Sequence, residues 1–361
     1  MTDLVVDAHH HLWDPTRASY PWMTAEVAPI ARAFGPADLA PRLAESGVDA
    51  TVVVQARSSV DETRDLLATA AATPFIAGVV GWIDLVGAQG GEDIAALRAG
   101  PGGEHLVGIR HQVHDEPDPA WLGRPDVRRG VAAVGRAGLA YDLLVRPREL
   151  PAALAIARDL PEVRFVIDHL AKPPILDGLL EPWASRLAPF GDLPNVACKL
   201  SGLVTEADWT TWERDQLVPY VDHAVAVFGP DRLLFGSDWP VCLLAASYAR
   251  VVETARSLVA RLSTTEQAAI FGGTPEVVGR MVDHLTNMVC RVNLDTQCRR
   301  GPDVLPFTGR KDSAMGTLSI VDAMRTFSIR SLVAVREADV ARLEALGRTS
   351  HFLGAPTQGE R

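Results

Sequence analysis

Cysteine is scarce in this sequence. Four cysteines occur in 361 residues, and no two of them form a CxxC pair. This spacing excludes a zinc knuckle and argues against a disulfide framework. Few unpaired cysteines are typical of a protein in a reducing compartment, so a cytoplasmic location is expected. The four are Cys198, Cys242, Cys290 and Cys298.

Long apolar runs and an excess of basic charge are also missing. No run of apolar residues has the length of about 20 that a membrane span needs. The first residues, MTDLVVDAHH, lack the basic start of a signal peptide. Acidic residues outnumber basic ones by 45 to 35, for a net charge of −10, so nucleic acid and anionic membranes are disfavoured as partners. The sequence leaves open whether the chain forms a homo-oligomer.

Eight short β-branched or apolar runs are present, each followed by a segment compatible with a helix. Strands that alternate with helices predict a parallel sheet. Eight such units within residues 4–239 predict an α/β fold, the (β/α)8 TIM barrel. An open doubly wound sheet is the weaker alternative, because no glycine fingerprint follows the first run. The eight runs span residues 4–10, 50–56, 75–82, 106–113, 139–146, 163–169, 195–202 and 232–239.

Polar residues gather where these predicted strands end. In a TIM barrel the catalytic residues lie at the carboxyl ends of the strands, so these side chains should meet in one site. They are His9 to His11, Arg110 and His111, Asp168 and His169, Lys172, Lys199, Ser201, Asp238 and Trp239.

The first strand ends in three consecutive histidines within VDAHHHLWDP. Side chains alternate along a strand, so His9 and His11 should share one face with Asp7, while His10 faces the helices. Two imidazoles on one face can share a divalent ion or bracket a substrate carbonyl without one. Packed core histidines are the alternative interpretation.

Three tryptophans also follow strand ends, namely Trp13, Trp82 and Trp239. They can stack on a sugar ring, although packing at the rim of a barrel is an equally common use of tryptophan.

Several motifs together resemble one family. VDAHHHLWDP with YPWM, VGIRHQVHDEPDPAWL, FVIDHLAKPPI, CKLSGLVTEADW and LLFGSDWPVC occur in this order, and IFGGTPEVVGRM resembles a closing helix. From residue 1 to about 280 the chain resembles the amidohydrolase superfamily, in its sugar-lactonase branch with the L-fuconolactonase and L-rhamnonolactonase types.

The resemblance implies a hydrolase of carbohydrate catabolism that opens a sugar-derived lactone. By resemblance, His9 and His11 are the pair of the first strand, and Asp238 is the general base. Two-metal members carry a lysine or glutamate on the fourth strand and a histidine on the fifth, and these are absent here. One zinc-like divalent ion on His9, His11 and Asp238, or no ion at all, is therefore expected, without NAD(P).

The residue types suit lactone hydrolysis. Asp238 can accept a proton from the attacking water. A metal ion can hold the developing oxyanion, or imidazoles and cations can do so electrostatically. The predicted catalytic residues are Asp238, His169, His111 and Arg110. The predicted substrate-binding residues are Trp13, Gln55, Trp82, Lys172, Lys199 and Trp239.

The end of the chain resembles a different family. The segment that begins near MVDHLTNMVCRVN and runs to about Arg336 resembles the carboxyl end of non-phosphorylating, NADP-dependent glyceraldehyde-3-phosphate dehydrogenases, within the aldehyde dehydrogenase superfamily. We expect a barrel over residues 1–282 and an orphan, partly disordered fragment over residues 283–361, joined by a gene fusion. FSIRSLVAV is expected to be a strand.

Three other functions compete with the lactonase. A metal-dependent decarboxylase of the same superfamily would need a firmly bound ion. An inactive or purely binding chimera would bind a sugar without turnover. An aldehyde dehydrogenase is disfavoured because the catalytic cysteine, the glutamate base and the cofactor-binding domain of that family are missing.

Overall fold

The structure is a computed structural model that describes residues 4–272 and four short segments of the chain beyond, namely 291–293, 308–309, 316–317 and 332–334. Residues 4–271 form one compact unit. The remaining residues belong to a second unit. Each unit is treated by itself.

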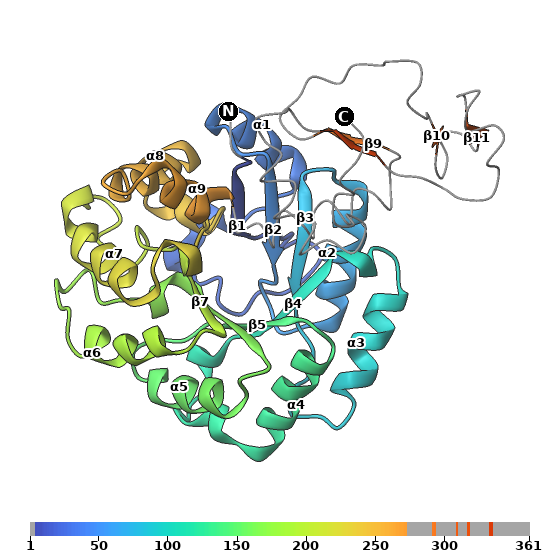
Figure 1. Ribbon diagram of the computed structural model, residues 1–361, viewed down its shortest axis with the longest axis horizontal. Coiled ribbons are helices and arrows are strands. Elements are labelled where there is room, and N and C mark those ends of the chain that lie inside the picture. Colours follow the sequence, from blue (N-terminus) through green and yellow to red (C-terminus); the bar gives the residue numbers. More distant parts are fainter. Residues whose placement is uncertain (1–3, 273–290, 294–307, 310–315, 318–331, 335–361) are drawn as a thin grey trace, which may run out of the picture. The chain divides into compact units, whose positions relative to one another are not determined.

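The first unit is a parallel eight-stranded barrel (Figure 1). Its strands follow one another in chain order, and each lies within one of the eight predicted runs, so the predicted TIM barrel is confirmed. The ring closes where the Asp238 N–H donates to the His9 carbonyl at 2.8 Å and the His11 N–H donates to the Trp239 carbonyl at 2.6 Å. The strands are β1 (Val6–His10), β2 (Ala50–Val54), β3 (Ile76–Gly81), β4 (Leu106–His111), β5 (Ala140–Leu143), β6 (Arg164–Ile167), β7 (Val196–Leu200) and β8 (Leu233–Phe235).

Helices surround the strands (Figure 1). Their buried apolar residues form one core with the outer faces of the strands. Side-chain caps fix where some helices begin. Ser59 accepts from the Glu62 N–H before α2, and Ser247 accepts from the Arg250 N–H before α8. The helices are α1 (Pro36–Ser46), α2 (Val60–Ala72), α3 (Gly90–Ala99), α4 (Pro125–Arg136), α5 (Leu150–Asp159), α6 (Trp183–Leu187), α7 (Arg214–Phe228), α8 (Tyr248–Leu258) and α9 (Thr264–Gly272).

A β-bulge interrupts the first strand. Asp7 pairs with Thr51 and His10 with Val53, so three steps on β1 match two steps on β2. The extra residue reverses the alternation between Asp7 and His9. The Asp7 carboxylate accepts from the Tyr248 hydroxyl of α8 at 3.1 Å. The prediction that Asp7 shares the face of His9 and His11 is therefore wrong.

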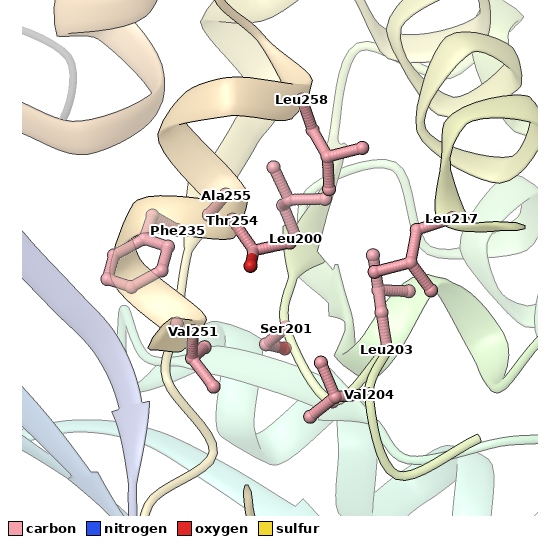
Figure 2. A pocket seen from close by; sticks show the side chains of 12 residues that line it. Leu200, Ser201, Leu203, Val204, Leu217, Phe235, Val251, Thr254, Ala255 and Leu258 are labelled. Atoms are coloured by element: carbon pink, nitrogen blue, oxygen red, sulfur yellow. The ribbon is translucent and has the colours of Figure 1, made fainter. Parts of the chain in front are cut away.

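A small cavity lies between β7, β8 and the helices α7 and α8 (Figure 2). Its volume is about 20 Å³, and its lining is mostly apolar, with Leu200, Phe235 and Leu258 among the residues. That volume holds about one water, whereas sites for small molecules measure about 300 Å³ or more.

The second unit contributes two short pairs of strands among its described residues. β9 (Arg291–Asn293) pairs in parallel with β12 (Leu332–Ala334), which lies within the predicted strand FSIRSLVAV. β10 (Thr308–Gly309) pairs antiparallel with β11 (Gly316–Thr317). The predicted boundary at residue 282 and the predicted disorder lie outside the described residues. Among the described residues, no helix has the length and apolar character to cross a bilayer.

Candidate active site

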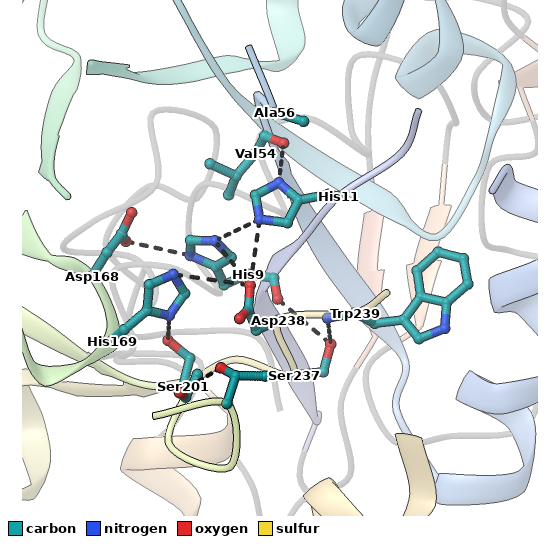
Figure 3. Close-up of polar contacts among 12 residues, drawn as sticks. His9, His11, Val54, Ala56, Asp168, His169, Ser201, Ser237, Asp238 and Trp239 are labelled. Atoms are coloured by element: carbon teal, nitrogen blue, oxygen red, sulfur yellow. Dashed lines mark hydrogen bonds and ion pairs between the residues drawn. The ribbon is translucent and has the colours of Figure 1, made fainter. Parts of the chain in front are cut away.

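Three histidines and one aspartate converge at the carboxyl ends of β1, β6 and β8 (Figure 3). The Nε2 atoms of His9 and His11 lie 3.2 Å apart. One oxygen of Asp238 lies 3.4 Å from His11 Nε2 and 3.9 Å from the Nε2 atoms of both His9 and His169. All four residues are buried. The structure thus brings together four of the predicted residues, His9, His11, His169 and Asp238.

Unusual backbone geometry brings two of these side chains to the site. His169, Leu170, Ala171 and Lys172 form a continuous left-handed turn with φ between 50° and 59°, and Asp238 has a φ of 57°. Left-handed conformations cost roughly 1–2 kcal/mol per non-glycine residue. Such strain persists where surrounding structure enforces it, commonly at functional sites.

The surroundings of this turn hold it in place. The buried Trp183 donates from its indole to the Leu170 carbonyl at 2.6 Å. A Cβ at Gly202 would lie 2.5 Å from His169 Nδ1, so only glycine lets the segment after β7 approach that ring.

Fixed hydrogen bonds leave particular ring nitrogens for a ligand. His11 Nδ1 lies 2.8 Å from the Val54 carbonyl, which can only accept, so Nδ1 carries the proton and Nε2 is left. His9 Nδ1 lies 3.3 Å from an oxygen of Asp168 and 3.2 Å from Lys199 Nζ. His9 Nδ1 can therefore donate to Asp168 or accept from Lys199, and only the first tautomer leaves a lone pair on Nε2 for a cation. Arg110 Nη1 lies 3.3 Å from that nitrogen.

A buried quartet of charges lies behind His9. Lys199 contacts Asp142 at 2.5 Å and Asp168 at 2.9 Å. Arg110 donates to Asp168 at 2.9 Å and also to the Gln55 carbonyl. Two cations therefore balance two carboxylates. Because their charges are paired, Arg110 and Lys199 influence the site mainly through their contacts with His9.

Burial and neighbouring charges set the protonation of the site. Burial lowers the pKa of His169 to about 4 and holds the pKa of His9 well below its usual value. Burial alone would raise the pKa of Asp238, but His169, His11 and His9 outweigh it and hold that pKa well below its usual value. At neutral pH, His9 and His169 are therefore uncharged, and Asp238 is ionised.

His9, His11 and Asp238 have the geometry of a zinc site. Ligand atoms on a tetrahedral zinc ion lie about 3.3 Å apart, given bonds of about 2.0–2.1 Å. The three separations here are 3.2, 3.4 and 3.9 Å. The neutral imidazole of His9 and the ionised carboxylate of Asp238 are also the ligand forms that zinc requires. Arg110 lies 3.3 Å from His9 Nε2 and would compete with an ion for that nitrogen.

The predicted residues His111 and Trp82 lie in a separate cluster. His111 accepts from the Trp82 indole at 3.0 Å and contacts Glu116 at 2.8 Å, and its ring stacks on Trp121 at 4.4 Å. Its neighbour Arg110 points to His9 instead, because alternate residues on β4 face opposite ways. The catalytic role of His111 stays a prediction.

The remaining predicted substrate contacts have other partners. Trp13 donates to the carbonyls of Ile30 and Arg32 and packs beside the His11 ring. Trp239 packs edge-on against Phe34, and its ring points away from His9, His11 and His169 (Figure 3). Both indoles match the packing alternative, and their contact with substrate stays a prediction.

The last two predicted substrate-binding residues, Lys172 and Gln55, differ in whether their polar groups have a partner. Lys172 pairs with Glu206 at 2.5 Å. Gln55 is buried, and its Oε1 atom has no hydrogen-bond partner, so Gln55 keeps a free acceptor.

One polar residue of the site, Asp142, was not predicted, and Ser201 was predicted only as a strand-end residue without a role. Asp142 lies inside the barrel opposite Lys199, and the Ser201 hydroxyl lies 2.9 Å from His169 Nδ1. An acid in the apolar run LAYDLL was the available signal for Asp142, because a lone buried carboxylate needs a partner. Ser201 stood at a predicted strand end without a partner that sequence could name.

The three consecutive histidines at the end of β1 should respond differently to replacement by alanine. His10 bonds to the Thr51 hydroxyl at 2.9 Å, away from Asp238. We expect His9→Ala and His11→Ala to lower kcat by about 100-fold or more, and His10→Ala to lower mainly the melting temperature. Steady-state kinetics and thermal unfolding of the three variants test this. A large kinetic defect in His10→Ala at a normal melting temperature would contradict it.

Asp7 should make stability depend on pH. Burial raises the pKa of Asp7 to about 6 from 3.8, so folding favours the protonated form, and stability is lost as pH rises from about 4 to 6. Asp7→Asn keeps an oxygen for the N–H groups of Ser237 and His9 but carries no charge. We expect the variant to gain up to about 3 kcal/mol over wild type at pH 8 and little at pH 4. Urea unfolding at both pH values measures this, and an equal effect at both would refute it.

The barrel and its cluster define a class of protein. Polar residues at the carboxyl ends of parallel strands, with an H-x-H pair on the first strand and an aspartate after the eighth, are what a barrel hydrolase uses. The amidohydrolase family model matches residues 6–278. The chain belongs to this family.

Named relatives lie in the predicted branch. The chain is 41% identical to an L-fucono-1,5-lactonase of Burkholderia multivorans over 285 residues, which cover 76% of this chain and 95% of that one. It is 44% identical to an L-fucono-1,5-lactonase of Burkholderia ambifaria, over 67% of this chain and 82% of that one. A crystal structure of an amidohydrolase from Burkholderia multivorans with bound zinc matches with a TM-score of 0.71 and 41% identity, over 75% of this chain and 97% of that one. The resemblance to the sugar-lactonase branch is confirmed.

Proposed function

We propose that the protein hydrolyses a sugar-derived lactone, an aldonolactone, to the open hydroxy acid. The observation that carries this proposal is the ionised Asp238 among three buried histidines at the mouth of the barrel. Relatives over 40% identical are named lactonases, which supports the same substrate class and does not favour the decarboxylase.

The residues have distinct parts in this reaction. Asp238 accepts a proton from the water as the water oxygen attacks the lactone carbonyl carbon. The bond from that carbon to the ring oxygen then breaks, and the leaving oxygen takes a proton. His169 is neutral and lies 3.9 Å from Asp238, beyond hydrogen-bond reach, so a relay through it needs the two side chains to move closer in the substrate complex. A zinc-like ion on His9, His11 and Asp238 would supply a Lewis acid for the carbonyl.

The charge quartet supports the first strand in this scheme. Asp168 and Lys199 both contact His9 Nδ1 and so fix the orientation of its ring. Arg110 holds Asp168 from the other side, at 2.9 Å. We assign Arg110 and Lys199 to this support. A homo-oligomer and a cytoplasmic location stay predictions.

A panel of aldonolactones in a pH-indicator assay tests the function. Each lactone is assayed with untreated enzyme, with chelator-treated enzyme and after zinc is restored. We expect hydrolysis of at least one aldonolactone, lost on chelation and recovered with zinc. Activity that survives complete removal of metal would reject the metal ion as a cofactor but leave the lactonase function supported. Tight sugar binding without hydrolysis of any lactone would reject the lactonase and favour the inactive chimera.

A further inference from the structure

Three successive carbonyls at the end of β2 each hold a side chain at or beside the site. The Val54 carbonyl accepts from His11 Nδ1 at 2.8 Å. The Gln55 carbonyl accepts from the Arg110 guanidinium, and the Ala56 carbonyl accepts from the Trp22 indole at 2.8 Å. This short segment of backbone therefore sets the direction of a candidate zinc ligand and of the cation beside it.

The same segment leaves the sheet at this point. The Gln55 N–H still donates to the Val80 carbonyl of β3 at 2.8 Å. The next two N–H groups, of Ala56 and Arg57, donate to Oε2 of Glu62 instead, at 3.0 and 2.9 Å. One carboxyl oxygen thus replaces the strand partners that these two groups no longer have.

Glu62 is well placed to hold this segment. It lies in the first turn of α2, whose start is fixed by the Ser59 cap, and only 5% of its surface is exposed. Burial raises the pKa of Glu62 to about 7, so both carboxyl forms occur near neutral pH. Either form offers an oxygen to the two N–H groups, so the contact does not depend on the charge.

We infer that Glu62 is a positioning residue: it holds the backbone of Val54, Gln55 and Ala56, and through it the His11 ring and the Arg110 guanidinium. Glu62 has no contact of its own with His9, His11, His169 or Asp238 among the hydrogen bonds of the described residues. Its effect on the reaction is therefore indirect.

Three variants and one control test this inference. Glu62→Ala removes the oxygen, Glu62→Asp withdraws it by one methylene, and Glu62→Gln keeps an amide oxygen in its place. Asp65→Ala is the control, because Asp65 is an exposed acid on the same helix. Long-range proton–nitrogen NMR of the histidine rings reports whether the His11 proton stays on Nδ1. This measurement needs no substrate.

The kinetic measurement rests on the proposed lactonase function. We expect Glu62→Ala to lower kcat/KM by about 10- to 100-fold and to mix the two tautomers of His11. Glu62→Asp should show a smaller change of the same kind, while Glu62→Gln and Asp65→Ala should match the wild type within about threefold. If no lactone is hydrolysed even by the wild type, the proposed function fails, and the NMR result still decides the role of Glu62.

Other outcomes overturn the inference. Glu62→Ala with a lower melting temperature but a normal His11 tautomer and a normal kcat/KM per folded molecule would make Glu62 purely structural. Should Glu62→Ala fail to fold, Glu62→Asp decides in its place. A wild-type His11 signal and a wild-type kcat/KM in Glu62→Asp would then reject the positioning role.

Discussion

Replacement of Asp238 by asparagine is expected to lower kcat/KM on a good lactone substrate by at least about 100-fold, with the fold retained. General-base groups contribute about 10²–10⁴ to rate. His169, His11 and His9 hold the pKa of Asp238 well below its usual value, so the wild-type residue is an ionised acceptor at neutral pH. An asparagine has nearly the same shape but cannot accept the proton of the attacking water.

Kinetics and zinc content together distinguish loss of the general base from loss of a metal ligand. Zinc content is determined on the same samples as the kinetics, because Asp238 also belongs to the candidate zinc site. Asp177→Asn is the matched control, since Asp177 is an exposed acid in the loop after β6. We expect the control to keep full activity. Wild-type kcat in a correctly folded Asp238→Asn protein would show that the assignment of the base is wrong.

Local sequence patterns predicted most of the barrel. All eight strands were predicted because each is a short apolar or β-branched run, and such runs are identified without knowledge of tertiary contacts. The pairing of His9 with His11 followed from alternation along one strand. The position of Asp238 followed from the rule that barrel strands direct catalytic residues to their carboxyl ends.

Features that depend on contacts between strands could not be predicted. The bulge that turns Asp7 toward α8 exists only in the pairing of β1 with β2. Asp142 is separated from Lys199 by 57 positions, and sequence alone could not name it as the partner. The left-handed turn at His169 contains no glycine, so composition gave no sign of it. Such exceptions to local rules occur where the site is built.

Loss of Lys199 is expected to have the largest effect on stability. The ammonium group is buried and lies within 2.5 Å of Asp142 and 2.9 Å of Asp168. Removal of one partner of a buried ion pair costs about 3–5 kcal/mol, because the other charge stays buried and unpaired. We therefore expect Lys199→Met to lower the free energy of unfolding at pH 8 by about that amount, as measured by urea denaturation.

A second substitution distinguishes the charge from simple packing. In the double variant with Lys199→Met and Asp142→Asn, the remaining pair of Arg110 and Asp168 is balanced, so most of the lost stability should return.

Lower pH should also reduce the loss of stability in the single variant Lys199→Met. Burial already raises the pKa of Asp142 to about 6, and loss of Lys199 raises it further, so folding then favours the protonated acid and stability is lost as pH rises. The deficit of Lys199→Met should therefore be smaller at pH 5 than at pH 8. An equal deficit at both pH values, with no recovery in the double variant, would mean that Lys199 acts through the packing of its side chain and not through its charge.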